Sequence, residues 1–145
     1  MLITFTIILI FFSLLVTIST NYKNNLTFYK YVLGIDRENN IIRNNLGNTY
    51  YEKKEYAQAI KQAQMVLATE PNAWDAYLIL GNVFREKGDL NEAEKFYRKT
   101  VLLNPQSSLA FNNLALIYRE KGEYKKAHEN FEKALSLDPE STLAM

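Results

Sequence analysis

Asparagine and arginine side chains recur at helical spacing along the chain, and their chemistry suits peptide binding. In the middle of the chain Asp75, Leu78, Asn82 and Arg85 are spaced by three, four and three, which places them on one face of a helix. Side-chain amides both donate and accept hydrogen bonds, so they can pair with the backbone of an extended peptide, and a guanidinium group can hold a carboxylate. The alternative is that these polar side chains are simply solvated on a helix surface.

Catalytic and metal-binding chemistry finds little support in the sequence. The sole histidine, His128, has no Ser, Cys or carboxylate at a spacing that makes a catalytic triad or a metal site, and the chain contains no Cys. No glycine-rich phosphate loop is present, since the glycines at 81 and 88 belong to a helix and a turn. The formal net charge of +1 argues against nucleic-acid binding. We therefore predict no enzyme activity, no catalytic or metal site, no cofactor and no small-molecule substrate.

An internal repeat must position these side chains. Pro71, Pro105 and Pro139 lie 34 residues apart, and alanine, leucine and aromatic residues keep the same interval. The other residues of this period are Ala59, Ala93 and Ala127, then Leu46, Leu80 and Leu114, then Tyr50, Phe84 and Tyr118. A fixed period in this range is typical of a solenoid in which each repeat buries its apolar face against its neighbours.

Each copy is predicted to be a helical hairpin. In the middle copy Tyr77, Leu80, Gly81 and Phe84 share one helix face, and Gly88 marks a turn. A second periodic run follows and ends at Asn104 and Pro105; its apolar face consists of Ala93, Phe96, Tyr97, Thr100 and Val101. The small residues Gly81 and Ala93 allow the two helices of the hairpin to approach closely.

This pattern resembles the tetratricopeptide repeat, W-x2-L-G-x2-Y followed by A, F and P at fixed offsets. The three copies read LGNTY from Leu46, LGNVF from Leu80 and LALIY from Leu114, with departures at Arg43, Ala63 and Ala115. The resemblance implies an all-α solenoid of three 34-residue helical hairpins, at residues 40–73, 74–107 and 108–141, followed by a tail at 142–145.

The resemblance also implies that the polar stripe lines a concave groove in which a segment of a partner protein binds. The predicted groove residues are Asn44, Asn48 and Tyr51 in the first copy, Asp75, Leu78, Asn82 and Arg85 in the second, and Asn112 and Arg119 in the third. A carboxylate clamp of the kind found in co-chaperones of this family is not expected. The positions that would carry its cations hold Asn44, Leu109 and Asn113 instead.

The first 20 residues are predicted to be a single transmembrane anchor. Met1 to Ile18 contain no charged side chain, and as a helix they would span roughly 27 Å, about the thickness of the hydrocarbon core. Lys and Arg follow this segment and none precedes it, so the positive-inside rule places the repeats on the cytoplasmic or stromal side. A cleaved signal peptide is the competing interpretation, although the segment has no basic n-region.

Residues 21–39 form either a linker at the membrane interface or half a repeat. Tyr29 and Leu33 fall two periods before Tyr97 and Val101, which belong to the second helix of the middle copy, so we expect a helix that packs on the first hairpin. At the other end no capping helix follows Pro139. We expect Ala127, Phe131 and Leu135 to be partly uncovered, either as a frayed end or as a docking face.

An anchor followed by three repeats is similar in layout to the photosystem I assembly proteins of plastids and cyanobacteria. Abundant Asn, Ile, Lys and Tyr agree with an AT-rich genome such as that of an organelle. The layout thus favours a membrane-anchored scaffold that assists assembly of a membrane complex such as photosystem I, in the plastid thylakoid. The alternatives are a membrane-bound receptor for targeting peptides and a bacterial envelope or pilus assembly protein.

Overall fold

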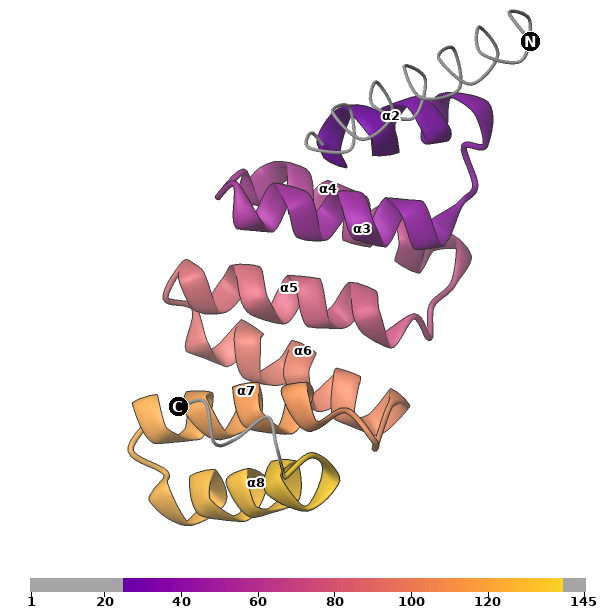
Figure 1. Ribbon diagram of the computed structural model, residues 1–145. Helices are drawn as coiled ribbons and strands as arrows, with labels where there is room; N and C mark the ends of the chain where they lie inside the picture. The colour runs from indigo at the N-terminus through magenta and orange to yellow at the C-terminus, as the bar shows by residue number, and fades with distance from the viewer. Residues whose placement is uncertain (1–24, 140–145) are drawn as a thin grey trace, which may run out of the picture.

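Seven helices make up the part of the chain that the structure describes. The computed structural model describes residues 25–139. The helices are α2 (Asn25–Ile35), α3 (Asn40–Glu52), α4 (Tyr56–Thr69), α5 (Trp74–Glu86), α6 (Leu90–Leu103), α7 (Ser108–Glu120) and α8 (Tyr124–Leu137). Each helix packs on the next, so that α2 and α8 lie at opposite ends of one stack (Figure 1). The described chain is therefore an all-helical solenoid of hairpins, as the period predicts.

The ends of the helices follow from local capping chemistry. The side chains of Asn39, Asp89 and Ser107 accept hydrogen bonds from the third residue beyond each of them, at the start of α3, α6 and α7. Gly88 and Gly122 end the first helices of two hairpins with φ of 79° and 77°. Lys54 occupies the equivalent position in the first hairpin with φ of 60°. The turn geometry therefore repeats even where glycine does not.

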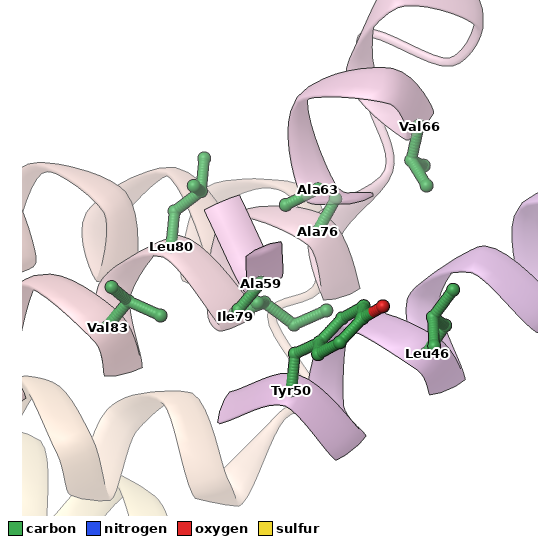
Figure 2. Packing of buried hydrophobic residues seen from close by; sticks show 9 residues of the cluster. All are labelled: Leu46, Tyr50, Ala59, Ala63, Val66, Ala76, Ile79, Leu80 and Val83. Carbon is green, nitrogen blue, oxygen red and sulfur yellow. The ribbon is translucent and has the colours of Figure 1, made fainter. Parts of the chain in front are cut away.

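The core consists of two clusters of buried side chains. The first joins α3, α4 and α5, with Leu46, Tyr50, Ala59, Ile79 and Val83 among its members (Figure 2). The second joins α6, α7 and α8, and its members are Ala93, Tyr97, Leu114, Ile117, Tyr118 and Ala127. Small side chains stand where helices approach most closely, and larger ones fill the space beside them.

Arg43, at the opening aromatic position of the first repeat, is buried where its counterpart Tyr77 is half-buried. Its guanidinium donates to the carbonyl of Arg37, to Gln62 Oε1 at 3.4 Å and to Met65 Sδ at 3.2 Å. A long cationic side chain thus takes the place of an aromatic ring between α3 and α4, and its polar end finds acceptors there.

Residues 25–35 form the helix α2, which packs on α3. Leu26, Tyr29 and Leu33 are partly buried against the first core cluster. Lys30 adds a cation–π contact, with its Nζ 5.7 Å from the centre of the Tyr50 ring. Part of the segment 21–39 therefore covers the apolar end of the first hairpin.

The C-terminal end differs from our expectation at one residue. Ala127 is buried with 4% of its surface exposed, because α8 packs against α7 at this point, so the prediction that it is partly uncovered is wrong. Phe131 is half-buried, and Leu135 is 46% exposed.

The predicted transmembrane segment, residues 1–20, lies outside the described residues. None of the helices within residues 25–139 has the length and hydropathy needed to cross a membrane.

Candidate partner-binding groove

The predicted groove residues lie on the first helices of the three hairpins. Asn44, Asn48 and Tyr51 belong to α3, the middle four to α5, and Asn112 and Arg119 to α7. These helices repeat at an interval of 34 residues, so the same helix face recurs in each hairpin. We call these nine residues the first-helix stripe.

Asn44 and Asp75 tie the first and second hairpins together. Asn44 is 6% exposed, and its Nδ2 donates to Asp75 Oδ2 at 2.7 Å. Its Oδ1 is buried and accepts no hydrogen bond from any residue in 25–139. Asn44 is one of the predicted groove residues; its burial and its bond to Asp75 place its amide beneath the exposed side chains of the stripe.

Asn82 holds a second link, between α5, α6 and α7. Its Oδ1 accepts from the hydroxyl of Tyr97 at 2.8 Å and from Asn113 Nδ2 at 3.2 Å. Tyr97 is fully buried, and burial raises the pKa of its hydroxyl, which remains a neutral donor. Asn82 is therefore fixed in orientation by two donors.

The interval between the linked residues shows how sequence reasoning missed Asn113. Asn44 and Asp75 are 31 residues apart, and so are Asn82 and Asn113. This interval is one repeat minus nearly one helical turn, so it joins the first helices of neighbouring hairpins. Polar residues 31 positions apart in the sequence would have indicated that Asn113 bonds to Asn82.

Arg85 is the partly buried one of the two cations of the stripe, the other being the exposed Arg119. Its side chain is 24% exposed, and its ion pair is with the adjacent Glu86 at 3.4 Å. Burial acts to lower the pKa of the guanidinium, but the neighbouring Tyr97, Tyr51 and Glu86 outweigh it and raise the pKa. Arg85 thus keeps its charge while part of its hydration is removed, which strengthens any contact with an anion.

Tyr51 lies beside Arg85 at the same end of the stripe. Burial raises the pKa of its hydroxyl, Glu86 raises it further and Arg85 opposes the shift. Tyr51 and Glu86 also line a hollow of about 150 Å³ between the ends of α3 and α5. The neutral hydroxyl and the cation therefore present a hydrogen-bonding group and a charge side by side.

The remaining stripe residues differ in accessibility. Asn48 and Arg119 are exposed, and Leu78 and Asn112 are half-buried. Asn112 Oδ1 is buried and, like that of Asn44, has no hydrogen-bond partner within residues 25–139. The structure therefore brings exposed and half-buried polar groups together along the first helices, with Asn44 beneath them.

Residues that could perform other chemistry stay apart. His128 is 75% exposed on α8, with its Nε2 3.3 Å from Glu132 Oε1. No three His, Asp or Glu side chains in the described region are grouped so that they could hold a metal ion.

The stacked hairpins and the stripe define a helical-repeat protein of the kind that binds other proteins. Models of the tetratricopeptide repeat match residues 44–108 and residues 108–141, which together exceed half of the chain. The chain therefore belongs to the tetratricopeptide repeat family, whose members are protein-interaction scaffolds.

Solved structures support the same fold. A crystal structure of MamA is 29% identical to this chain, with a TM-score of 0.68. The match covers 79% of this chain and 67% of the MamA chain. A structure of MamA 41-end from Desulfovibrio magneticus RS-1 is 23% identical, with a TM-score of 0.69 over 83% of this chain and 68% of that chain. No curated protein matches this sequence.

Proposed function

We propose that this chain is a scaffold that binds an acidic, extended segment of a partner protein along the first-helix stripe. The observation that carries the proposal is Arg85, a partly buried cation whose ion pair within residues 25–139 is a 3.4 Å contact with its own neighbour. A partner carboxylate would give the guanidinium a stronger, two-pronged contact than Glu86 does. Asn48 and Asn112 would pair with the backbone of the same segment.

We further propose that the scaffold is anchored by residues 1–20 and assists assembly of a membrane protein complex, such as photosystem I in the plastid thylakoid. The charge-free stretch from Met1 to Ile18 and the basic residues that follow it support the anchor and its orientation. A groove that offers amides and arginine suits acidic segments better than the basic helices a presequence receptor must bind.

Affinity capture from detergent-solubilised membranes tests the binding surface. We expect the full chain to recover subunits of one membrane complex, and Arg85→Gln to lose most of them. Lys125→Gln is the matched control, because it removes one exposed cation on α8, away from the stripe. Equal recovery by Arg85→Gln and the parent would refute the stripe as the contact surface. Recovery of many unrelated precursor proteins would replace the assembly function with a targeting function.

Thiol labelling tests the membrane arrangement separately. The chain has no cysteine, so Ser136→Cys on α8 introduces a single reactive thiol. In sealed vesicles with the cytoplasmic or stromal face inward, we expect a membrane-impermeant maleimide to react after detergent is added and not before. Labelling of intact vesicles of that orientation would reverse the proposed topology and favour an envelope function.

A further inference from the structure

A cleft on the second helices is separate from the first-helix stripe. It has a volume of about 620 Å³ and lies between α6 and α8, with α5 and α7 contributing its floor. Tyr77, Phe96, Leu114 and Tyr118 supply apolar and aromatic surface. No residue of the stripe is among the described residues that line it. The chain therefore presents two distinct surfaces.

A departure from the 34-residue period explains why this cleft is open. Phe96 packs against the first core cluster, with its ring 6.3 Å from that of Tyr77 and 5.4 Å from that of Phe84. One period later the residue is Asn130, whose shorter side chain turns back to donate to the carbonyl of Lys126 at 2.8 Å. The third hairpin thus lacks, beside the cleft, the aromatic ring that the second hairpin has at the equivalent position.

The rim of the cleft is cationic. Lys95, Arg98 and Lys99 line it, and the described lining residues include no Asp or Glu. Lys99 Nζ lies 5.9 Å from the centre of the Tyr77 ring and pairs with no carboxylate in residues 25–139. Leu102, 71% exposed, adds an apolar side chain to the same rim.

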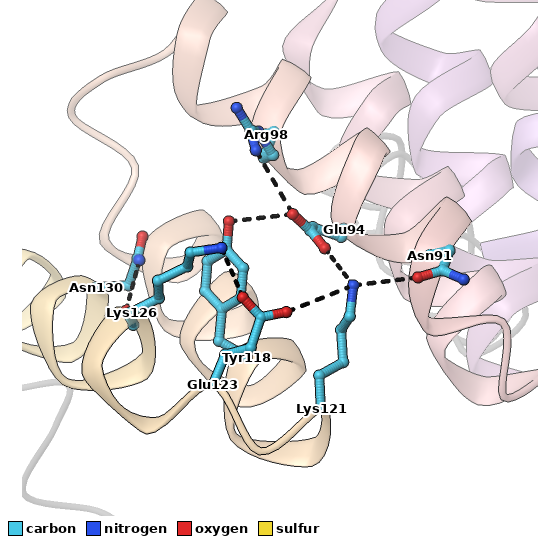
Figure 3. Close-up of polar contacts among 8 residues, drawn as sticks. All are labelled: Asn91, Glu94, Arg98, Tyr118, Lys121, Glu123, Lys126 and Asn130. Carbon is cyan, nitrogen blue, oxygen red and sulfur yellow. Dashed lines mark hydrogen bonds and ion pairs between the residues drawn. The ribbon is translucent and has the colours of Figure 1, made fainter.

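The nearest carboxylates are already engaged by side chains of the protein. Glu94 accepts from Lys121 at 2.6 Å and from the hydroxyl of Tyr118 at 3.2 Å, and it lies 3.5 Å from Arg98 (Figure 3). Glu123 pairs with Lys126 at 2.6 Å on the next turn of chain. The Glu94 contact holds Tyr118 in the cleft floor. Lys95 pairs with Glu92 at 3.1 Å, so Lys99 is the lysine of the rim that has no carboxylate partner within residues 25–139.

We propose that this cleft binds a second acidic segment of a partner protein, one that carries an aromatic or aliphatic anchor between carboxylates. The anchor would rest on Tyr77, Phe96 and Tyr118, and the flanking carboxylates would meet Lys99 and Arg98. Apolar contact supplies the affinity, and the cations of the rim, of which Lys99 has no carboxylate partner within residues 25–139, select an acidic partner.

Fluorescence anisotropy on the full chain in detergent tests the proposal with a labelled peptide, Asp-Glu-Phe-Glu-Leu-Asp-Glu. We expect saturable binding that weakens with added salt, and no binding of a peptide with lysine at each acidic position. Lys99→Glu should weaken binding about tenfold, because it replaces an attraction by a repulsion. Lys61→Glu makes the same charge change on α4, outside the cleft, and should bind as the parent does.

Asn130→Phe is the second variant, because it restores the ring found one repeat earlier and fills the cleft while leaving every charge in place. We expect it to fold at least as stably as the parent and to lose peptide binding. Equal affinity of Lys99→Glu, Asn130→Phe and the parent would overturn the proposal, as would equal binding of the lysine peptide. Loss of binding in Arg85→Gln with full binding in Asn130→Phe would assign the peptide to the first-helix stripe and would also overturn it.

Discussion

Replacing Gly81 with alanine tests how tightly the middle hairpin is packed. A Cβ atom on Gly81 would lie 2.6 Å from Cε1 and 2.7 Å from Cδ1 of Tyr97, well inside van der Waals contact. The Tyr97 ring is fully buried, and its hydroxyl is held by Asn82 at 2.8 Å. The ring therefore cannot move aside without losing that hydrogen bond, and α5 and α6 must separate instead.

The expected magnitude is the difference between two opposing terms. Overpacking a filled core costs about 1–3 kcal/mol, whereas alanine in a helix interior is favoured over glycine by about 1 kcal/mol. We expect Gly81→Ala to lower the free energy of unfolding by up to about 2 kcal/mol, measured by urea unfolding with far-UV circular dichroism on the full chain in detergent. Displacement of the ring also frees Asn82, so partner capture should fall with stability.

Gly47→Ala provides the matched control. Gly47 is the equivalent of Gly81 in the first hairpin, where Ala63 stands in place of Tyr97. Its Cβ would lie 3.1 Å from Ile79 Cδ1 and 3.4 Å from Gln62 Cβ, so a small side-chain shift relieves the contact. We expect a free energy of unfolding within about 0.5 kcal/mol of the parent. If the two variants were equally stable, the fixed contact between Gly81 and Tyr97 would be refuted.

Three further substitutions test other parts of the structure. Lys54→Gly should stabilise the fold by about 0.5–1 kcal/mol in the same unfolding assay, because a φ of 60° strains the lysine backbone and suits glycine, as at Gly88. A variant less stable than the parent would contradict the shared turn geometry. Ala93→Leu should cost about 1–3 kcal/mol, since Ala93 is fully buried where α5 and α6 meet; a neutral result would argue against that close contact. Burial acts to raise the pKa of Glu94, but hydrogen bonds from Lys121 and others outweigh it and lower the pKa below its ordinary value of 4.5. The ionised carboxylate therefore stabilises the fold above that value, and this effect is lost as the pH falls through the lowered pKa. The stability advantage of the parent over Glu94→Gln should therefore shrink in acid. A difference in stability that stays constant with pH would refute this coupling.

The helical hairpins and most of their core were predictable because the 34-residue period follows the packing of each hairpin. Residues that recur every 34 positions are those that meet in every hairpin, so Leu46, Ala59 and Tyr50 are buried together as expected. Arg43 was harder to interpret. A cation at an aromatic position interrupts the repeat pattern. Its burial is explained by the carbonyl of Arg37 and the side-chain oxygen of Gln62, which the fold brings close to the guanidinium.

The candidate site was predictable in outline but not in its internal bonding. Helical spacing identified the face that carries Asn82 and Arg85, since that depends on one helix alone. Whether an amide on that face is open or tied to the next hairpin depends on how the two helices are rotated about each other. That rotation is set by packing, which is why the bond from Asn44 to Asp75 could not be predicted from helical spacing alone.

Departures from the period therefore carry more information about function than the period itself. In the first two hairpins, Arg43 occupies the space between α3 and α4 and Phe96 packs against α5, so both side chains contribute to stability. Between α6 and α8, Asn130 stands one period after Phe96, and Lys99 stands one period after Met65. The result is an open cleft with a cationic rim. A repeat that served packing alone would gain from a ring at position 130. Asn130→Phe thus separates the two roles, because a gain in stability with a loss of acidic-peptide binding is the outcome expected of a surface kept open for a partner.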